Sequence, residues 1–157
     1  MKIVFITILF VIVSALLQHI THEIFHIVVG KLVGLSLVSV KWFTFHGGTK
    51  VTFKGEEEII SCNNGSIPKE WIIENLAGII GTTVMSYIFV IIYLILPTGY
   101  IKLLFWVLSA AFLINDSGYA VFCSFSNSGD LYLVNKYFNN RQYRTKILLK
   151  FNISDII

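Results

Sequence analysis

Charged residues are scarce in this sequence. Asp, Glu, Lys and Arg make up 13% of its 157 residues, about half of the roughly 25% that an average soluble domain carries. A chain with so few charges has little material for a solvated surface, and hydrophobic residues make up 55% of it. The composition therefore favours a membrane protein, and the length predicts one domain spanning residues 1–157.

Cysteine and proline are rare as well. Cys62 and Cys123 are the two cysteines, and no C-x-x-C spacing occurs. Neither a thiolate metal site nor a disulfide framework is therefore indicated. Of the two prolines, Pro97 follows a long apolar run and predicts its end.

Long apolar runs are abundant instead, and they predict transmembrane helices at about 3–34, 70–96 and 101–125. The first run is longer than the roughly 30 Å hydrocarbon core, so we expect it to tilt or protrude. A cleaved signal peptide is the alternative for its first part, where Lys2 precedes an apolar stretch. The apolar pattern continues past any such cleavage point, which favours a helix.

Residues 36–54 have a different pattern. β-Branched and aromatic residues alternate there with polar ones, on both sides of Gly47-Gly48. This pattern is typical of a β-hairpin that turns at the two glycines. The predicted fold class is thus an all-α integral membrane protein of about three transmembrane helices, with a β-hairpin between the first and the second.

Positive residues are unevenly distributed about the predicted helices. Lys2 and Lys102 fall on one side, and ten fall on the other, in and around the hairpin and in the basic tail 131–157. Because cytoplasmic segments are enriched in Lys and Arg, we expect a multi-pass protein of the cell membrane with a cytoplasmic C-terminus. Basic residues beside apolar spans indicate contact with the lipid bilayer, and without a reader motif no nucleic-acid partner is expected. The ten are Lys31, Lys41, Lys50, Lys54, Lys69, Lys136, Arg141, Arg144, Lys146 and Lys150.

His22, Glu23 and His26 interrupt the first apolar run. On a helix, His22 and His26 stack on one face, one turn apart, where both can bind one metal ion. In an H-E-x-x-H pattern the glutamate is the general base for a metal-activated water. Ionisable side chains inside a span cost on the order of 2.5–3.5 kcal/mol each on insertion scales, and metal coordination would offset that cost. The alternative is a polar patch that joins neighbouring helices by hydrogen bonds.

A third ligand must come from elsewhere, because a catalytic zinc takes three protein ligands and a water. Asp116 and Asp130 are the acids that we find in or near the apolar spans, and both fall near the expected cytoplasmic end of the third helix. His19 shares the face of His22, but three ligands from one straight helix fit a tetrahedron poorly. His46 falls in the predicted hairpin turn. The residues alone leave Asp116 and Asp130 open.

The sequence resembles the site-2 protease family of intramembrane zinc metalloproteases, reduced to a three-helix core. The resemblance rests on four features: the His22–His26 motif, the glycine pair of the hairpin, Asn75-Leu76-Ala77-Gly78 in the second apolar run, and an acid after the third. The sequence departs from the family at Asp130. A glycine, Gly129, precedes this aspartate, whereas in the family a glycine follows it. The sequence also has Ile79 where the family often has a proline.

The resemblance implies a zinc metalloendopeptidase that acts on membrane-embedded or membrane-adjacent polypeptides. It favours Asp130 over Asp116, so that Zn²⁺ is bound by His22, His26 and Asp130 and Glu23 is the catalytic base. It also implies that the hairpin, with Gly47 and Gly48, holds an extended substrate.

Asn75 is a further candidate for substrate binding, as a donor to the tetrahedral oxyanion, with a helix-packing hydrogen bond as the alternative. For the whole protein, two other functions are open. One is a non-catalytic membrane protein with a structural or sensory zinc site, and the other is a membrane scaffold without a metal.

Overall fold

The computed structural model describes residues 2–42, 49–61, 67–125 and 129–139. Gly47, Gly48 and the basic residues after position 139 lie outside the described residues. The elements, in chain order, are α1 (Lys2–Leu32), β1 (Leu37–Lys41), β2 (Lys50–Phe53), α2 (Glu56–Ser61), α3 (Lys69–Ile95) and α4 (Tyr100–Phe125). Residues 131–139 are also helical.

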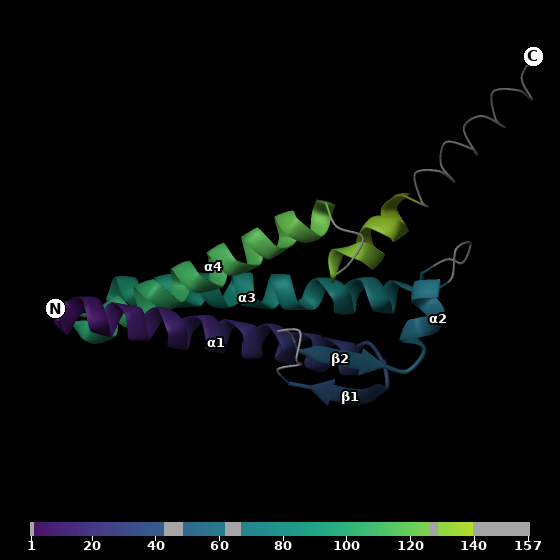
Figure 1. Cartoon of the computed structure of the whole chain (residues 1–157), viewed down its shortest axis with the longest axis horizontal. Coiled ribbons are helices and arrows are strands. Elements are labelled where there is room, and N and C mark those ends of the chain that lie inside the picture. The colour runs from purple at the N-terminus through teal and green to yellow at the C-terminus, as the bar shows by residue number, and fades with distance from the viewer. Residues whose placement is uncertain (1, 43–48, 62–66, 126–128, 140–157) are drawn as a thin grey trace, which may run out of the picture.

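The helices α1, α3 and α4 form a bundle in which each contacts the other two. Each of the three is long and apolar enough to cross a membrane, and each begins and ends within two residues of its predicted bounds. Figure 1 shows α1 and α3 side by side, with α4 diverging from them toward its C-terminal end. Leu96, which precedes Pro97, is extended and ends α3, because proline disfavours a helical conformation in the residue before it.

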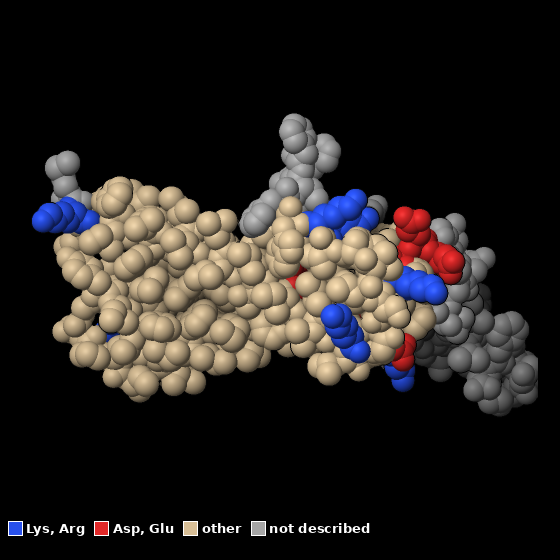
Figure 2. All heavy atoms as spheres, turned by 90° about the horizontal axis from the view of Figure 1, so that it is seen from below, with Lys and Arg blue, Asp and Glu red and all other residues tan. Residues whose placement is uncertain are grey.

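The outer surface of the bundle is apolar and its interior carries polar groups. Val84 on α3 is 51% exposed, whereas Ser14, Thr82 and Asp116 are buried between the helices. Figure 2 shows charged side chains gathered at one end, over the hairpin and α2, and a mostly uncharged surface along the rest. This arrangement reverses that of a soluble protein and is compatible with a multi-pass membrane protein.

The predicted hairpin is present. β1 and β2 pair antiparallel, with Val40 opposite Val51, and the residues between the strands that would form the turn lie largely outside the described ranges. β2 packs on the end of α1 at Gly30, where a Cβ would come within 2.3 Å of the Phe53 ring. The absence of a side chain at Gly30 therefore allows the hairpin to sit directly on the helix.

A small apolar core lies where the hairpin meets the bundle. Phe53 of β2 and Trp71 of α3 contact edge to face, with ring centroids 6.3 Å apart. Leu133 and Val134 are buried in the same core, so helix 131–139 is fixed against the start of α3. The whole core consists of Phe53, Ile67, Trp71, Ile72, Leu133 and Val134.

Helix α2 is not among the helices that the sequence predicts. It begins after Gly55, which has a φ of +89° that suits glycine. Glu56, Glu57 and Glu58 occupy its first turn, where negative charge interacts favourably with the helix dipole. These three glutamates therefore form a helix N-terminus.

Candidate metal centre

The inner face of α1 carries the two histidines. Its buried residues recur every fourth position, at Ser14, Gln18, His22, His26 and Gly30, so the imidazoles are stacked on the side that faces the other helices. Gly78 of α3 lies opposite them. A Cβ at Gly78 would come within 2.4 Å of His22 Nε2 and 2.5 Å of His26 Nε2. Because Gly78 has no side chain, α3 leaves room for both rings.

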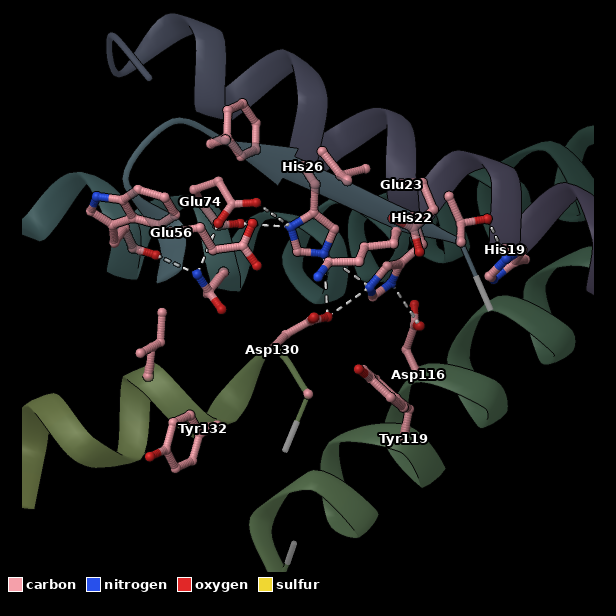
Figure 3. Close-up of a pocket in the computed structure, with 18 of the residues that line it drawn as sticks. His19, His22, Glu23, His26, Glu56, Glu74, Asp116, Tyr119, Asp130 and Tyr132 are labelled. Carbon is pink, nitrogen blue, oxygen red and sulfur yellow. Dashed lines mark hydrogen bonds and ion pairs between the residues drawn. The ribbon is translucent and has the colours of Figure 1, made fainter. Parts of the chain in front are cut away.

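Three potential ligand atoms meet at one point. His22 Nε2 lies 2.9 Å from Asp130 Oδ2 and 3.1 Å from His26 Nε2, and His26 Nε2 lies 3.2 Å from Asp130 Oδ2. Figure 3 shows the Asp130 carboxylate pointing at both rings. In a tetrahedral zinc site with bonds near 2.0–2.1 Å, neighbouring ligand atoms are about 3.3 Å apart. The triangle of donors therefore has the size that one metal ion needs.

Each imidazole also has a carboxylate at its other nitrogen. His22 Nδ1 lies 3.1 Å from Asp116 Oδ1, and His26 Nδ1 lies 3.0 Å from Glu74 Oε1. In a neutral ring that donates from Nδ1, Nε2 has a free lone pair. Two such lone pairs and a carboxylate oxygen then face one another, which is an arrangement that a cation stabilises. The three residues can thus hold a metal ion, and carboxylate–histidine pairing is the usual support of such ligands.

Asp116 is bonded from three sides and is 2% exposed. Besides His22, it accepts hydrogen bonds from Gln18 Nε2 at 2.6 Å and from the Thr82 hydroxyl. The three partners come from α1 and α3 while Asp116 belongs to α4, so this network ties the bundle together behind His22.

Glu74 is the corresponding partner of His26. Its main-chain carbonyl also lies 2.9 Å from His26 Nδ1, and its second carboxylate oxygen accepts a hydrogen bond of 2.8 Å from Asn75 Nδ2. Glu74 is 7% exposed. A buried carboxylate costs several kcal/mol unless it is well bonded, and here its two oxygens each have a partner.

Asp130 reaches the site from outside the three long helices. Gly129 before it has a φ of +79°, and helix 131–139 after it is anchored by Leu133 and Val134 in the apolar core. Burial opposes the charge on the Asp130 carboxyl, but hydrogen bonds from His22 and His26, in the state in which their Nε2 atoms carry protons, outweigh burial and hold its pKa well below the ordinary value. A cation in place of those protons would favour the ionised carboxylate that a metal ligand must have.

The donor triangle opens into a pocket of about 860 Å³. Glu23 lines it beside the histidines, and Lys50, Val51 and Phe53 bring β2 to its wall. Glu56 of α2 lines it too, and within the described part of the chain its Oε2 has no hydrogen-bond partner. Burial raises the pKa of the Glu56 carboxyl. The pocket therefore joins the donor triangle, an acid with one unbonded oxygen, and a strand.

No protein-family model, curated protein or solved structure matches the chain. A function for the site must therefore be argued from its own geometry.

The predicted site residues are only partly brought together. His22, His26 and Asp130 meet in the triangle, and Glu23 lines the pocket around it. Asp116, the other acid considered, lies at His22 Nδ1 and not among the three donors. Gly47 and Gly48 lie outside the described residues, as does His46.

Asn75 and His19 both line the pocket but have other partners. Asn75 Nδ2 donates to Trp71 O and Glu74 Oε2, each at 2.8 Å. His19 Nε2 lies 2.9 Å from Thr49 Oγ1, so His19 connects α1 to the segment just before β2. Neither residue is among the three donors.

Glu74, Thr82 and Gln18 are not among the residues predicted for the site. Asp116 and Asp130 were the two acids considered in or near the apolar spans, and Glu74 of α3 is a third. Its spacing was a usable signal: Glu74, Gly78 and Thr82 recur every fourth residue, which puts them on one helix face. An acid, a glycine and a hydroxyl on one face of an apolar helix indicate a polar site there.

Proposed function

We propose that this protein is an intramembrane zinc metalloprotease that hydrolyses peptide bonds of membrane-embedded or membrane-adjacent polypeptides. The observation that carries the proposal is the triangle of His22 Nε2, His26 Nε2 and Asp130 Oδ2, with a carboxylate bonded to the far nitrogen of each ring. Two imidazoles and one carboxylate form a ligand set of catalytic zinc, in which the fourth position is left to water or substrate.

The chemistry would be divided between the ion and the side chains. A bound zinc ion supplies Lewis acidity, toward a water molecule and toward a peptide carbonyl. His22, His26 and Asp130 would hold it. Glu23 takes a proton from the attacking water and delivers it to the departing amine nitrogen, so that water and peptide become a carboxylic acid and an amine.

The pocket also suits an extended polypeptide. The two-stranded sheet leaves one edge of β2 without a strand partner among the described residues, and three residues of β2 line the pocket. A free strand edge binds an extended peptide through main-chain hydrogen bonds. A substrate helix must unwind before its backbone can be hydrolysed, and pairing with β2 would hold it unwound.

The depth of the site supports a substrate at the membrane boundary. His22 lies 20 residues after Lys2, which corresponds to about 30 Å of helix and to the roughly 30 Å of a hydrocarbon core. The charged end of the molecule in Figure 2 lies on the side of the hairpin. We therefore propose that the site lies at the inner boundary of the cell membrane, on the side where we expect the C-terminus.

The test is a comparison of the wild type with Glu23→Gln. Both proteins are purified in detergent, loaded with zinc and incubated with a panel of labelled single-span peptides in the same micelles. We expect the wild type to cleave at least one peptide and Glu23→Gln to cleave it about 10²–10⁴-fold more slowly, the usual contribution of a general base. Glu70→Gln, an exposed glutamate of α3, is the matched control and should cleave like the wild type.

Other outcomes separate the alternatives. Equal cleavage by the wild type and Glu23→Gln would remove Glu23 as the base. Bound zinc without cleavage of any peptide would support a structural or sensory zinc site. The absence of bound zinc would support a membrane scaffold without a metal.

A further inference from the structure

Glu74 and Asn75 stand together at the start of α3 and have no part in the chemistry described above. We propose that they act as one positioning unit, in which Asn75 holds the Glu74 carboxylate and Glu74 holds the His26 ring with Nε2 aimed at the metal. The inference rests on the proposed metal site, but not on its being a protease. It assigns Asn75 a role other than oxyanion binding.

Glu74 restrains His26 through two acceptors. His26 Nδ1 lies 2.9 Å from the Glu74 main-chain carbonyl oxygen and 3.0 Å from Glu74 Oε1. The carbonyl belongs to a helix and cannot move far, so it fixes the distance between the ring and α3. The carboxylate adds a negative charge, which raises the basicity of the coordinating nitrogen. Figure 3 shows Glu74 on the side of His26 away from Asp116.

Asn75 uses both of its amide hydrogens. A side-chain amide has two N–H donors, and Asn75 Nδ2 donates to Trp71 O and to Glu74 Oε2, each at 2.8 Å. Both partners are acceptors only, so the nitrogen and not the oxygen of the amide must face them. No N–H of this amide then remains for a tetrahedral oxyanion unless a bond to Glu74 or Trp71 breaks.

The bonds form a continuous chain from the apolar core to the metal site. Trp71, 5% exposed in the core, anchors Asn75 through its carbonyl. Asn75 anchors one oxygen of Glu74, and the other oxygen bonds His26. Trp71, Glu74 and Asn75 lie on one short segment of α3, so the helix transmits the position of the core to His26 of α1. This chain of bonds would keep the imidazole of His26 in a fixed orientation.

The experiment measures metal binding without any substrate. Zinc affinity is determined by competition with a chromophoric chelator, and the visible spectrum of the Co²⁺-loaded protein reports the ligand geometry. We expect Glu74→Gln to weaken zinc binding about 10–100-fold, the usual effect of removing an outer partner of a ligand. Asn75→Ala should weaken it too, by less, and both variants should shift the Co²⁺ bands. Because the two residues act through one bond, the double variant should bind zinc at most two- to three-fold more weakly than Glu74→Gln does.

Glu70→Gln, one turn earlier on the same helix and exposed, is the matched control and should change neither zinc affinity nor the Co²⁺ spectrum. If Asn75→Ala does not fold in the metal-free state, Asn75→Asp serves in its place. Asn75→Asp keeps the shape of the side chain, removes both donors and sets a like charge against Glu74.

Three results would overturn the inference or its Asn75 half. Unchanged zinc affinity and Co²⁺ spectrum in Glu74→Gln would make Glu74 a helix-packing residue, and a wild type without bound metal would leave nothing to position. Unchanged zinc affinity in the Asn75 variant, together with slower cleavage, would instead support Asn75 as a hydrogen-bond donor to the tetrahedral oxyanion. A zinc-binding wild type that cleaves no peptide contradicts the protease and leaves the positioning unit standing.

Discussion

The two ends of the molecule differ in what they expose and in what they bury. Along most of the bundle many apolar residues point outward, as Val84 does at 51% exposed, and polar Ser14 and Thr82 are buried together with apolar Phe112. At the hairpin end Phe53, Trp71 and four further apolar residues are buried in a core. The surface of the first region is compatible with an apolar solvent, whereas the second has the usual arrangement of a domain in water.

The donor triangle lies where these two regions meet. His22 and His26 belong to the bundle, whereas Asp130 is held by helix 131–139, which packs in the core of the hairpin end. A metal ion bound there would therefore need both regions. Under the proposed function, water and an unwound peptide would reach the site from the hairpin side, while the bundle would keep its hydrogen bonds strong on the other.

The largest expected effect comes from comparing two tryptophans. Trp71 is 5% exposed in the apolar core, and Trp106 is 53% exposed on α4. Trp71→Ala should lower the free energy of unfolding in micelles by about 3–5 kcal/mol, as truncation of a buried aromatic does. Trp106→Ala should change it by less than about 1 kcal/mol, because lipid or detergent tails replace the lost contacts. Thermal unfolding of the metal-free proteins measures both, and equal losses would contradict the contrast between the two regions.

A slightly smaller effect is expected from a charge on the bundle surface. Val84 is about halfway along α3, and Val38 is on β1 with 63% of its surface exposed. Val84→Lys should disfavour membrane insertion by about 2.5–3.5 kcal/mol, the cost of a charge at the centre of a spanning helix. Val38→Lys should be neutral within about 0.5 kcal/mol, as at other exposed sites in water. The membrane-integrated fraction of each variant is the readout, and an equally well inserted Val84→Lys would mean that this face does not meet lipid.

Much of the fold could be predicted because its signals are local. An apolar run of membrane length specifies a helix on its own, and the alternation on both sides of Gly47-Gly48 specifies a hairpin. The i, i+4 spacing of His22 and His26 likewise identified their two imidazoles as candidate metal ligands. Helix α2 was not predicted because Glu56–Ser61 is only six residues long, too short to show a helical periodicity.

The outer shell of the site depends on how the helices face one another. The spacing of Glu74, Gly78 and Thr82 indicates a polar face on α3, but not that this face meets α1, where Glu74 bonds His26. Nor does it indicate that Thr82 bonds Asp116 of α4. The residues alone left Asp116 and Asp130 open as third ligand, and the choice of Asp130 rested on a resemblance, because its approach depends on the φ of Gly129 and on the burial of Leu133 and Val134.

The most direct test of the metal site is zinc stoichiometry in three proteins: the wild type, Asp130→Ala and Asp116→Asn. We predict one zinc per chain in the wild type and loss of zinc in Asp130→Ala, since a ligand atom is removed. Asp116→Asn should keep one zinc with weaker affinity, because the amide oxygen still accepts from His22 Nδ1. A wild type without zinc, or an Asp130→Ala variant that binds it as tightly as the wild type, would contradict the site formed by His22, His26 and Asp130.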